Sequence, residues 1–103
     1  MNRKLIDTAK RTMAAYPLYS QEEVEDKVVV MKLFDTFGEG VWYVVEYDPE
    51  DELIFCYVTG LVEDEWGYTS VRELAELTLR KTGTPFIEVD RHFTPTLFGQ
   101  LKP

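Results

Sequence analysis

The residues that could carry chemistry gather near the C-terminal end of the chain. They are Glu88, Asp90, Arg91 and His92. A histidine titrates near neutral pH and an adjacent carboxylate can orient it, so this group contains what acid–base catalysis needs. Two more carboxylates, Glu46 and Asp48, join the group if the strand expected near residue 88 lies beside the strand expected over 41–47. Three interpretations stay open: Arg91 pairs with an acid and holds the segment down, the group recognises a ligand or partner, or it catalyses a reaction.

Other catalytic and ligand patterns are missing, so we expect no cofactor and no bound metal. The chain has one cysteine and one histidine, too few for a structural zinc site. The glycines at 38 and 40 join two strands and lack the spacing of a phosphate-binding loop. The acidic stretch 48–52 has no glycine at its bend and makes a poor calcium loop. Ser70 is explained as a helix cap.

The elements that must position these residues centre on three apolar runs, at 28–34, 41–47 and 53–58. β-Branched and aromatic residues dominate them, which is typical of strands. Loop signals separate the runs: glycines within 35–40, and Asp48-Pro49 at the second junction. The sequence therefore predicts an antiparallel β-meander. Its second run has two faces, and we expect the more uniformly apolar one, with Tyr43, Val45 and Tyr47, to meet the helices rather than the one with Trp42 and Glu46.

Helices are predicted on both sides of the meander. Asn2 can cap a first helix that ends before Pro17, and its apolar stripe consists of Leu5, Ile6, Ala9 and Met13. Ser70 and Glu73 form a capping box that opens a second helix over about 70–81, with Gly83 closing it. The fold class is α+β.

The remaining segments are short. Residues 86–89 read as a fourth strand, and Thr94-Pro95 as the cap and first residue of a terminal helical turn. Trp66 and Tyr68 flank a glycine in a predicted loop, where they either anchor the core or form a recognition surface. If exposed, Trp42 or Trp66 would favour recognition of a ligand or partner.

Charge divides the chain unevenly. With 103 residues and 45% hydrophobic content, the chain is one domain over 1–103. The net charge is −8, but residues 20–65 alone carry −12, from fourteen acids and two lysines, while both ends are mildly cationic. Such a surface repels phosphate backbones and disfavours nucleic-acid binding through the sheet. No run can span a bilayer, and the unpaired Cys56 fits a reducing, cytoplasmic compartment.

The order of motifs along residues 17–98 resembles the bacterial domain-of-unknown-function family 2958. The matching positions are Lys32-Leu33-Phe34, Trp42 with Glu46 and Asp48, Phe55 with Gly60, Glu65-x-Gly67-Tyr68-x-Ser70-x-x-Glu73-Leu74, and Glu88-x-Asp90-x-x-Phe93. The chain departs from the family pattern at Val89, where arginine is usual, and in a third run poorer in glycine. The resemblance implies an accessory role in plasmids, phages or other mobile elements, and it implies no reaction.

Together these observations favour a small acidic accessory protein that binds a protein partner, with no expectation about its oligomeric state. Residues that could serve binding are Trp42, Glu46, Asp48, Trp66, Tyr68, Glu88, Asp90, Arg91 and His92. The alternatives are an inhibitor that mimics nucleic acid and blocks a host defence enzyme, and a small enzyme that uses His92 with Glu88 or Asp90. A further alternative is direct binding of nucleic acid through the basic ends of the chain, which predicts an affinity that collapses with added salt. The acidity can also be explained without any binding role, because a high net charge keeps a protein soluble.

Overall fold

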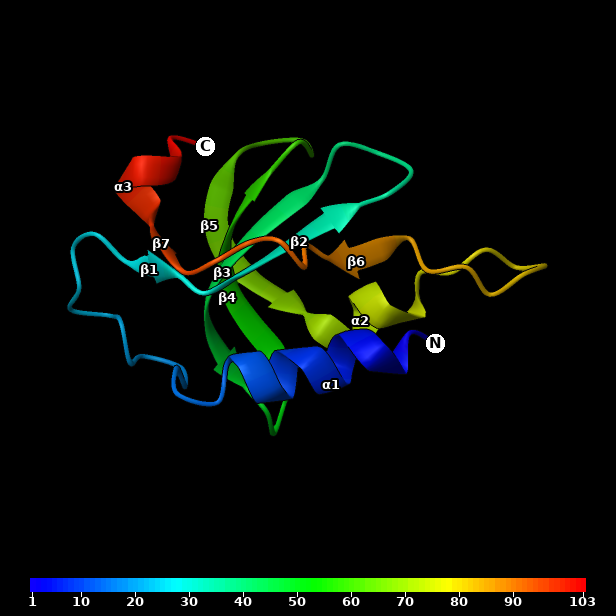
Figure 1. The fold of residues 1–103 in the computed structure, drawn as a ribbon, viewed down its shortest axis with the longest axis horizontal. Coiled ribbons are helices and arrows are strands. Elements are labelled where there is room, and N and C mark those ends of the chain that lie inside the picture. The colour runs from blue at the N-terminus through cyan, green and yellow to red at the C-terminus, as the bar shows by residue number, and fades with distance from the viewer.

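The computed structural model describes all of residues 1–103, and Figure 1 shows its α+β architecture. In chain order the elements are α1 (Arg3–Thr12), β1 (Val28–Val29), β2 (Met31–Asp35), β3 (Val41–Asp48), β4 (Leu53–Thr59), β5 (Glu65–Ser70), α2 (Val71–Glu76), β6 (Ile87–Val89), β7 (Thr96–Leu97) and α3 (Phe98–Leu101).

Five strands form one antiparallel sheet in the order β5-β4-β3-β2-β6. The predicted meander is its centre, β2-β3-β4, and two more strands extend it at the edges. β1 and β7 make a separate two-stranded ribbon, with Val28 opposite Leu97. This ribbon brings the C-terminal segment back beside the start of the meander (Figure 1).

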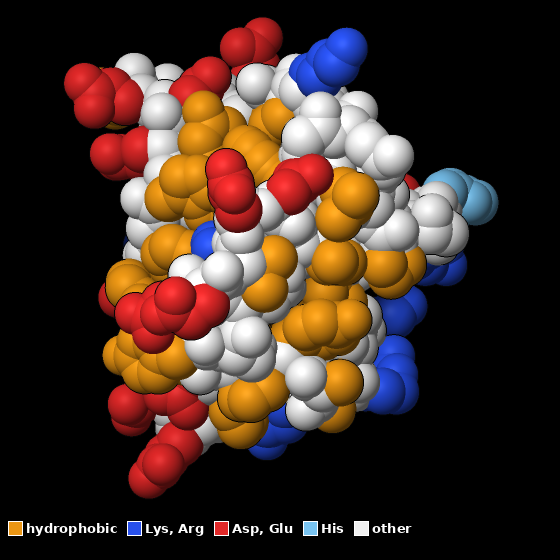
Figure 2. All heavy atoms as spheres, turned by 90° about the vertical axis from the view of Figure 1, so that its left-hand side faces the viewer, with side chains coloured by type: hydrophobic (Ala, Val, Ile, Leu, Met, Phe, Trp, Pro, Cys, Tyr) orange, Lys and Arg blue, Asp and Glu red, His pale blue; other side chains and the backbone are white.

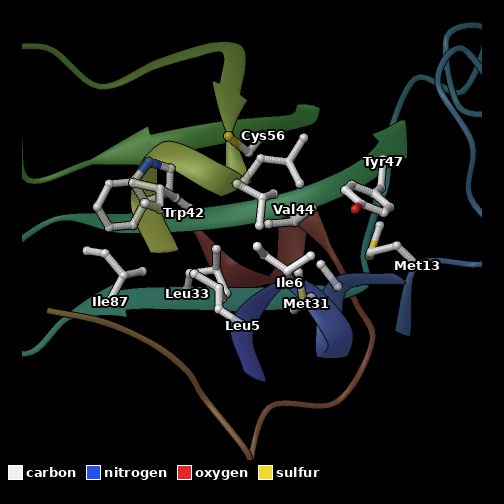
Figure 3. Close-up of a cluster of buried hydrophobic side chains, with 14 of the residues drawn as sticks. Leu5, Ile6, Met13, Met31, Leu33, Trp42, Val44, Tyr47, Cys56 and Ile87 are labelled. Atoms are coloured by element: carbon white, nitrogen blue, oxygen red, sulfur yellow. The ribbon is translucent and has the colours of Figure 1, made fainter. Parts of the chain in front are cut away.

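Helices α1 and α2 cover one face of the sheet, and the core lies between them and the strands. The stripe predicted for α1 is confirmed, because Leu5, Ile6, Ala9 and Met13 are all buried. Asn2 caps this helix by accepting the Leu5 N–H, and its own backbone N–H donates to the carbonyl of Ala75 in α2 at 2.7 Å. Figure 3 shows side chains of α1 pointing at Leu33 and Val44 of the sheet.

The predicted inner face of β3 is wrong for its first half. Trp42 and Val44 belong to the core under the helices, whereas Tyr43 is only half-buried and lies on the other face. A β-bulge between Val44 and Glu46 then inserts an extra residue, which reverses the alternation. Tyr47 therefore joins the same core as Trp42 (Figure 3). No alternation pattern could anticipate this shift.

The segment around Trp66 and Tyr68 is not a loop, because it forms β5, the edge strand beside β4. Helix α2 follows it directly, and the Ser70 Oγ accepts the Glu73 N–H at 3.1 Å as the capping box predicts. The helix ends at Glu76, however, five residues earlier than expected. Residues 78–85 turn back as a small hairpin, in which Thr78 bridges Pro85, and threonine is a weak helix former.

The C-terminal cap prediction is also wrong. Thr94 and Pro95 lead into the short strand β7, and α3 begins only at Phe98, after Leu97, with no side-chain cap. Backbone pairing of Val28 with Leu97 takes the place of the predicted first helical turn.

Candidate binding face

The sheet face opposite the helices carries five aromatic side chains in mutual contact, which we call the aromatic face. Its members are Phe55 and Tyr57 of β4, Trp66 and Tyr68 of β5, and Phe98 of α3. Trp66 lies at the centre: its ring centroid is 5.5 Å from Phe55, 5.3 Å from Tyr57 and 4.8 Å from Phe98. These centroid distances lie in the range at which aromatic rings attract one another, so the contacts stabilise the cluster.

Strand register explains how four of the rings meet. Phe55 lies opposite Tyr68 and Tyr57 opposite Trp66, and cross-strand partners project from the same face. Phe98 arrives from the far end of the chain, held by its N–H to the carbonyl of Lys27 at 2.8 Å. The next N–H, of Gly99, donates to the Asp26 carboxylate, also at 2.8 Å. The cluster therefore combines one hairpin with a segment about thirty residues away.

The aromatic face is partly open to solvent. Trp66 is 36% exposed and Tyr68 is 53% exposed, while Phe55, Tyr57 and Phe98 are half-buried. Figure 2 shows a broad hydrophobic surface interrupted by acidic side chains, with most of the visible Lys and Arg side chains along one edge. Exposed contiguous apolar patches with a polar rim mark interaction sites in soluble proteins.

Few of the acidic groups are neutralised within the molecule. The structure has two ion pairs, Lys32 with Asp90 at 3.9 Å and Arg72 with Glu52 at 2.7 Å. None of these four residues belongs to the aromatic face. Most carboxylates of residues 20–65 therefore have no cationic partner within the molecule, and their negative potential can attract a cationic ligand or partner.

One edge of the aromatic face contains a small hollow of about 180 Å³ above the Glu46 carboxylate. Phe55, Tyr68 and Tyr19 contribute aromatic walls, and Glu22 adds a second carboxylate. Lys27 also lines the hollow, but its ammonium already donates to the carbonyls of Gln21 and Val24, each at 2.8 Å. Desolvation, followed by the charges of Tyr19 and Glu46, raises the pKa of the Tyr68 phenol.

Glu46 is 2% exposed, yet it has no cationic partner. Its two oxygens accept the backbone N–H groups of Tyr19 and Gln21, both at 2.9 Å. Tyr19 has a positive φ of 71°, a conformation that is unfavourable for a bulky residue, and this bond helps to hold it there. The ring of Tyr19, 63% exposed, is thereby placed at the hollow.

The structure separates the residues that the sequence grouped around Glu88. Strand β6 pairs with β2, so β2 lies between it and β3, and Glu46 and Asp48 do not join the C-terminal group. Asp90 pairs with Lys32 and accepts the His92 N–H through Oδ1 at 3.0 Å. The side chains of Glu88, Arg91 and His92 are exposed, and Arg91 forms no ion pair with the meander.

The other predicted binding residues divide between core and surface. Trp42 is a core residue rather than an exposed anchor, because it packs beneath α2 against Gly40, where a Cβ would come within 2.9 Å of its ring. Asp48 stabilises the β3–β4 turn by accepting the Glu50 N–H at 2.9 Å. Trp66 and Tyr68 do lie on the aromatic face. Sequence reasoning missed Phe55, Tyr57 and Phe98, although the alternation of β4 already placed the first two on one face.

No three His, Cys, Asp or Glu side chains come together in a way that could hold a metal ion. Among the helices, none has the length and apolar character needed to cross a membrane.

Comparison with family models gives a match over most of the chain. The family model described as a protein of unknown function (DUF2958) matches residues 3–98. Searches of curated proteins and of solved structures found no match.

Proposed function

This chain belongs to the DUF2958 family of proteins of unknown function, and we propose that it is a protein-interaction module whose aromatic face binds a basic segment of a partner protein. The observation that carries the proposal is the set of five touching rings, partly exposed, on an acidic molecule in which few carboxylates are neutralised.

Lysine and arginine are the side chains that such a face suits best. Their cations are attracted to the faces of Trp and Tyr rings, and their alkyl stems pack on the same rings. The surrounding carboxylates attract a basic partner and accelerate its association. A phosphate backbone, in contrast, meets the negative charge of residues 20–65, which opposes stacking of nucleic-acid bases on the rings.

The hollow above Glu46 supports one anchoring contact within this proposal. Two carboxylates, Glu46 and Glu22, lie among three aromatic walls, and the only cation there is already bound to two carbonyls. An ammonium or guanidinium group entering the hollow gains both charge attraction and ring contacts. The partner segment is therefore expected to place one lysine or arginine at this position and to lay its neighbours over Trp66.

The finer role as an accessory protein of a plasmid or phage rests on the family resemblance alone and is part of this proposal. Mimicry of nucleic acid is its special case, because a nucleic-acid-binding enzyme is one kind of protein with a basic surface. Mimicry requires carboxylates spaced along one surface like phosphates, and acids that intermingle with aromatic rings favour the general case. Exposure of His92 on an open surface likewise counts against an enzyme built on that residue.

A titration followed by amide NMR tests the proposal. The probes are a short lysine- and arginine-rich peptide, its counterpart with glutamate at those positions, and a single-stranded DNA oligonucleotide. We expect the basic peptide, and neither of the other two probes, to shift signals of β4, β5 and α3, with an affinity that falls as salt increases.

Variants locate the binding. Trp66→Ala is expected to lower the affinity for the basic peptide roughly tenfold or more, because it removes a central aromatic anchor. Phe37→Ala is the matched control, since Phe37 is an exposed ring that contacts Phe86 and lies outside the aromatic face. Absence of peptide binding, equal effects of the two variants, or preferential binding of the oligonucleotide to β4 and β5 would refute the proposal.

A further inference from the structure

A second hollow, of about 340 Å³, lies on the helix-covered side of the sheet, between α1 and the segment around β6. It is lined by three cationic side chains, Lys4 and Arg11 from α1 and Arg91 from just after β6. Thr8 and the carboxylate Glu88 also line it. This hollow shares no residue with the aromatic face or with the hollow above Glu46.

The geometry of α1 explains why its cations meet. Lys4, Thr8 and Arg11 are separated by four and three residues, so they lie on one side of the helix. The neighbouring stripe of Leu5 and Ala9 is buried against the sheet, which holds this polar side at the boundary with β6. Asn2 strengthens the contact by donating from Nδ2 to the carbonyl of Ile87 at 3.1 Å. Arg91 is therefore presented across the hollow from α1.

These cations are not used within the molecule. None of the three takes part in an ion pair, whereas the two pairs that exist employ Lys32 and Arg72. Glu88 is the single carboxylate among the nine lining residues, so the hollow keeps an excess of positive charge in a chain whose net charge is −8. A concave surface with charge of one sign concentrates the field and attracts counter-ions.

We propose that this hollow binds a phosphate group, borne either by a small phosphorylated molecule such as a nucleotide or by a nucleic-acid strand. Guanidinium groups such as those of Arg11 and Arg91 bind phosphate oxygens through paired N–H donors, and Lys4 adds a point charge. The Thr8 hydroxyl is a further donor. The volume exceeds that of one phosphate group and falls within the range of small-molecule sites, so an attached group has room.

The test is a titration of the full chain with AMP, pyrophosphate, acetate and a single-stranded DNA oligonucleotide at fixed ionic strength, read by amide NMR. We expect AMP and pyrophosphate to shift signals of α1 and residues 87–91, with acetate at least about tenfold weaker. If the oligonucleotide binds no tighter than AMP, the phosphate group belongs to a small molecule. If it binds tighter, the phosphate group belongs to a nucleic-acid strand.

Arg11→Gln and Arg91→Gln should each lower the affinity for AMP about tenfold. Arg80→Gln is the charge-matched control, because Arg80 is exposed in the hairpin after α2 and does not line the hollow. If a Gln variant unfolds more easily, Arg91→Lys serves instead, and it should retain the charge but lose part of the affinity. The inference is overturned if no phosphate probe binds, if acetate binds as tightly, or if Arg80→Gln weakens binding as much as the other two.

This outcome is independent of the proposed function. Basic peptides and phosphates are expected on opposite sides of the sheet, so either site can fail while the other stands.

Discussion

Gln21 donates its backbone N–H to Oε2 of Glu46 at 2.9 Å, and both side chains are buried. The Gln21 amide completes the contact, since its Nε2 donates to the carbonyls of Val28 and Val45 and its Oε1 accepts the Val28 N–H. A polar network thus fastens the loop between α1 and β1 to the bulge of β3. Because Tyr19 belongs to this loop, the same network shapes the hollow on the aromatic face.

Replacing the carboxylate of Glu46 should therefore destabilise the protein. In Glu46→Gln one of the two acceptor oxygens becomes an NH₂ group, which faces a backbone N–H and leaves it unpaired. A buried donor without a partner costs about 1–3 kcal/mol, and we expect a loss of about 2 kcal/mol in urea unfolding. Hydrogen exchange of the Tyr19 and Gln21 amides should accelerate as well.

Glu22→Gln is the control for that change. Glu22 carries the same charge and lines the same hollow. Its side chain is exposed, however, and its carboxylate accepts no hydrogen bond, because the amides of Tyr19 and Gln21 donate to Glu46. Its effect on the free energy of unfolding should stay within about 0.5 kcal/mol. Equal effects of the two substitutions would mean that net charge, and not the Glu46 network, stabilises the loop.

The hydroxyl of Tyr47 is buried without a hydrogen-bond partner, in a side chain that is 2% exposed. An unpaired buried hydroxyl is unfavourable, so Tyr47→Phe should leave the free energy of unfolding unchanged or raise it by up to about 1 kcal/mol. Tyr47→Ala should lower it by about 3–5 kcal/mol, because the ring fills the core. A loss above 1 kcal/mol in Tyr47→Phe would reveal a partner for the hydroxyl.

Alkaline pH should destabilise the protein through Cys56. Burial raises the pKa of this thiol from 9.0 to about 11, partly offset by a hydrogen bond with Thr69. Below pH 9 the thiol is neutral in both states. Between pH 9 and 11 it ionises in the unfolded chain but not in the folded one, so stability falls, by roughly 2 kcal/mol over the window.

Cys56→Val removes the titrating group but is somewhat larger, so the two proteins are compared by how their stability changes with pH and not by its absolute value. We expect its unfolding free energy to decline less steeply than that of the unsubstituted protein between pH 9 and 10. Ionisation of Tyr47, whose pKa is raised mainly by burial and then by Glu52, adds to the decline only above pH 10 in both proteins. Parallel curves between pH 9 and 10 would contradict the assignment to Cys56.

Two glycines should respond differently to the same substitution. Gly60 has a φ of +79°, and a Cβ there would collide with the backbone of Glu39, so Gly60→Ala should cost more than about 2 kcal/mol. Gly67 in β5 has no atom within 4 Å of an added Cβ, and Gly67→Ala should be neutral or mildly stabilising. Thermal unfolding of the two variants measures the difference, and a similar fall in Tm for both would contradict it.

Local patterns in the sequence determined the parts of this fold that depend on neighbouring residues. The strands of the meander follow from β-branched and aromatic runs, and the helix starts follow from the caps Asn2 and Ser70, because a cap acts within three residues. Pairing Phe55 with Tyr57 on one face also needed nothing beyond alternation.

Long-range pairing decided the rest. A one-residue bulge moved Tyr47 to the helix-covered face, and pairing of β6 with β2 kept Glu88 away from Glu46. The ribbon of β1 and β7 delivered Phe98 to Trp66, and the fold of α1 against β6 placed Arg11 and Arg91 around one hollow. These contacts join segments far apart in the chain, and their free energy exists only once the sheet is assembled, so no local pattern encodes them.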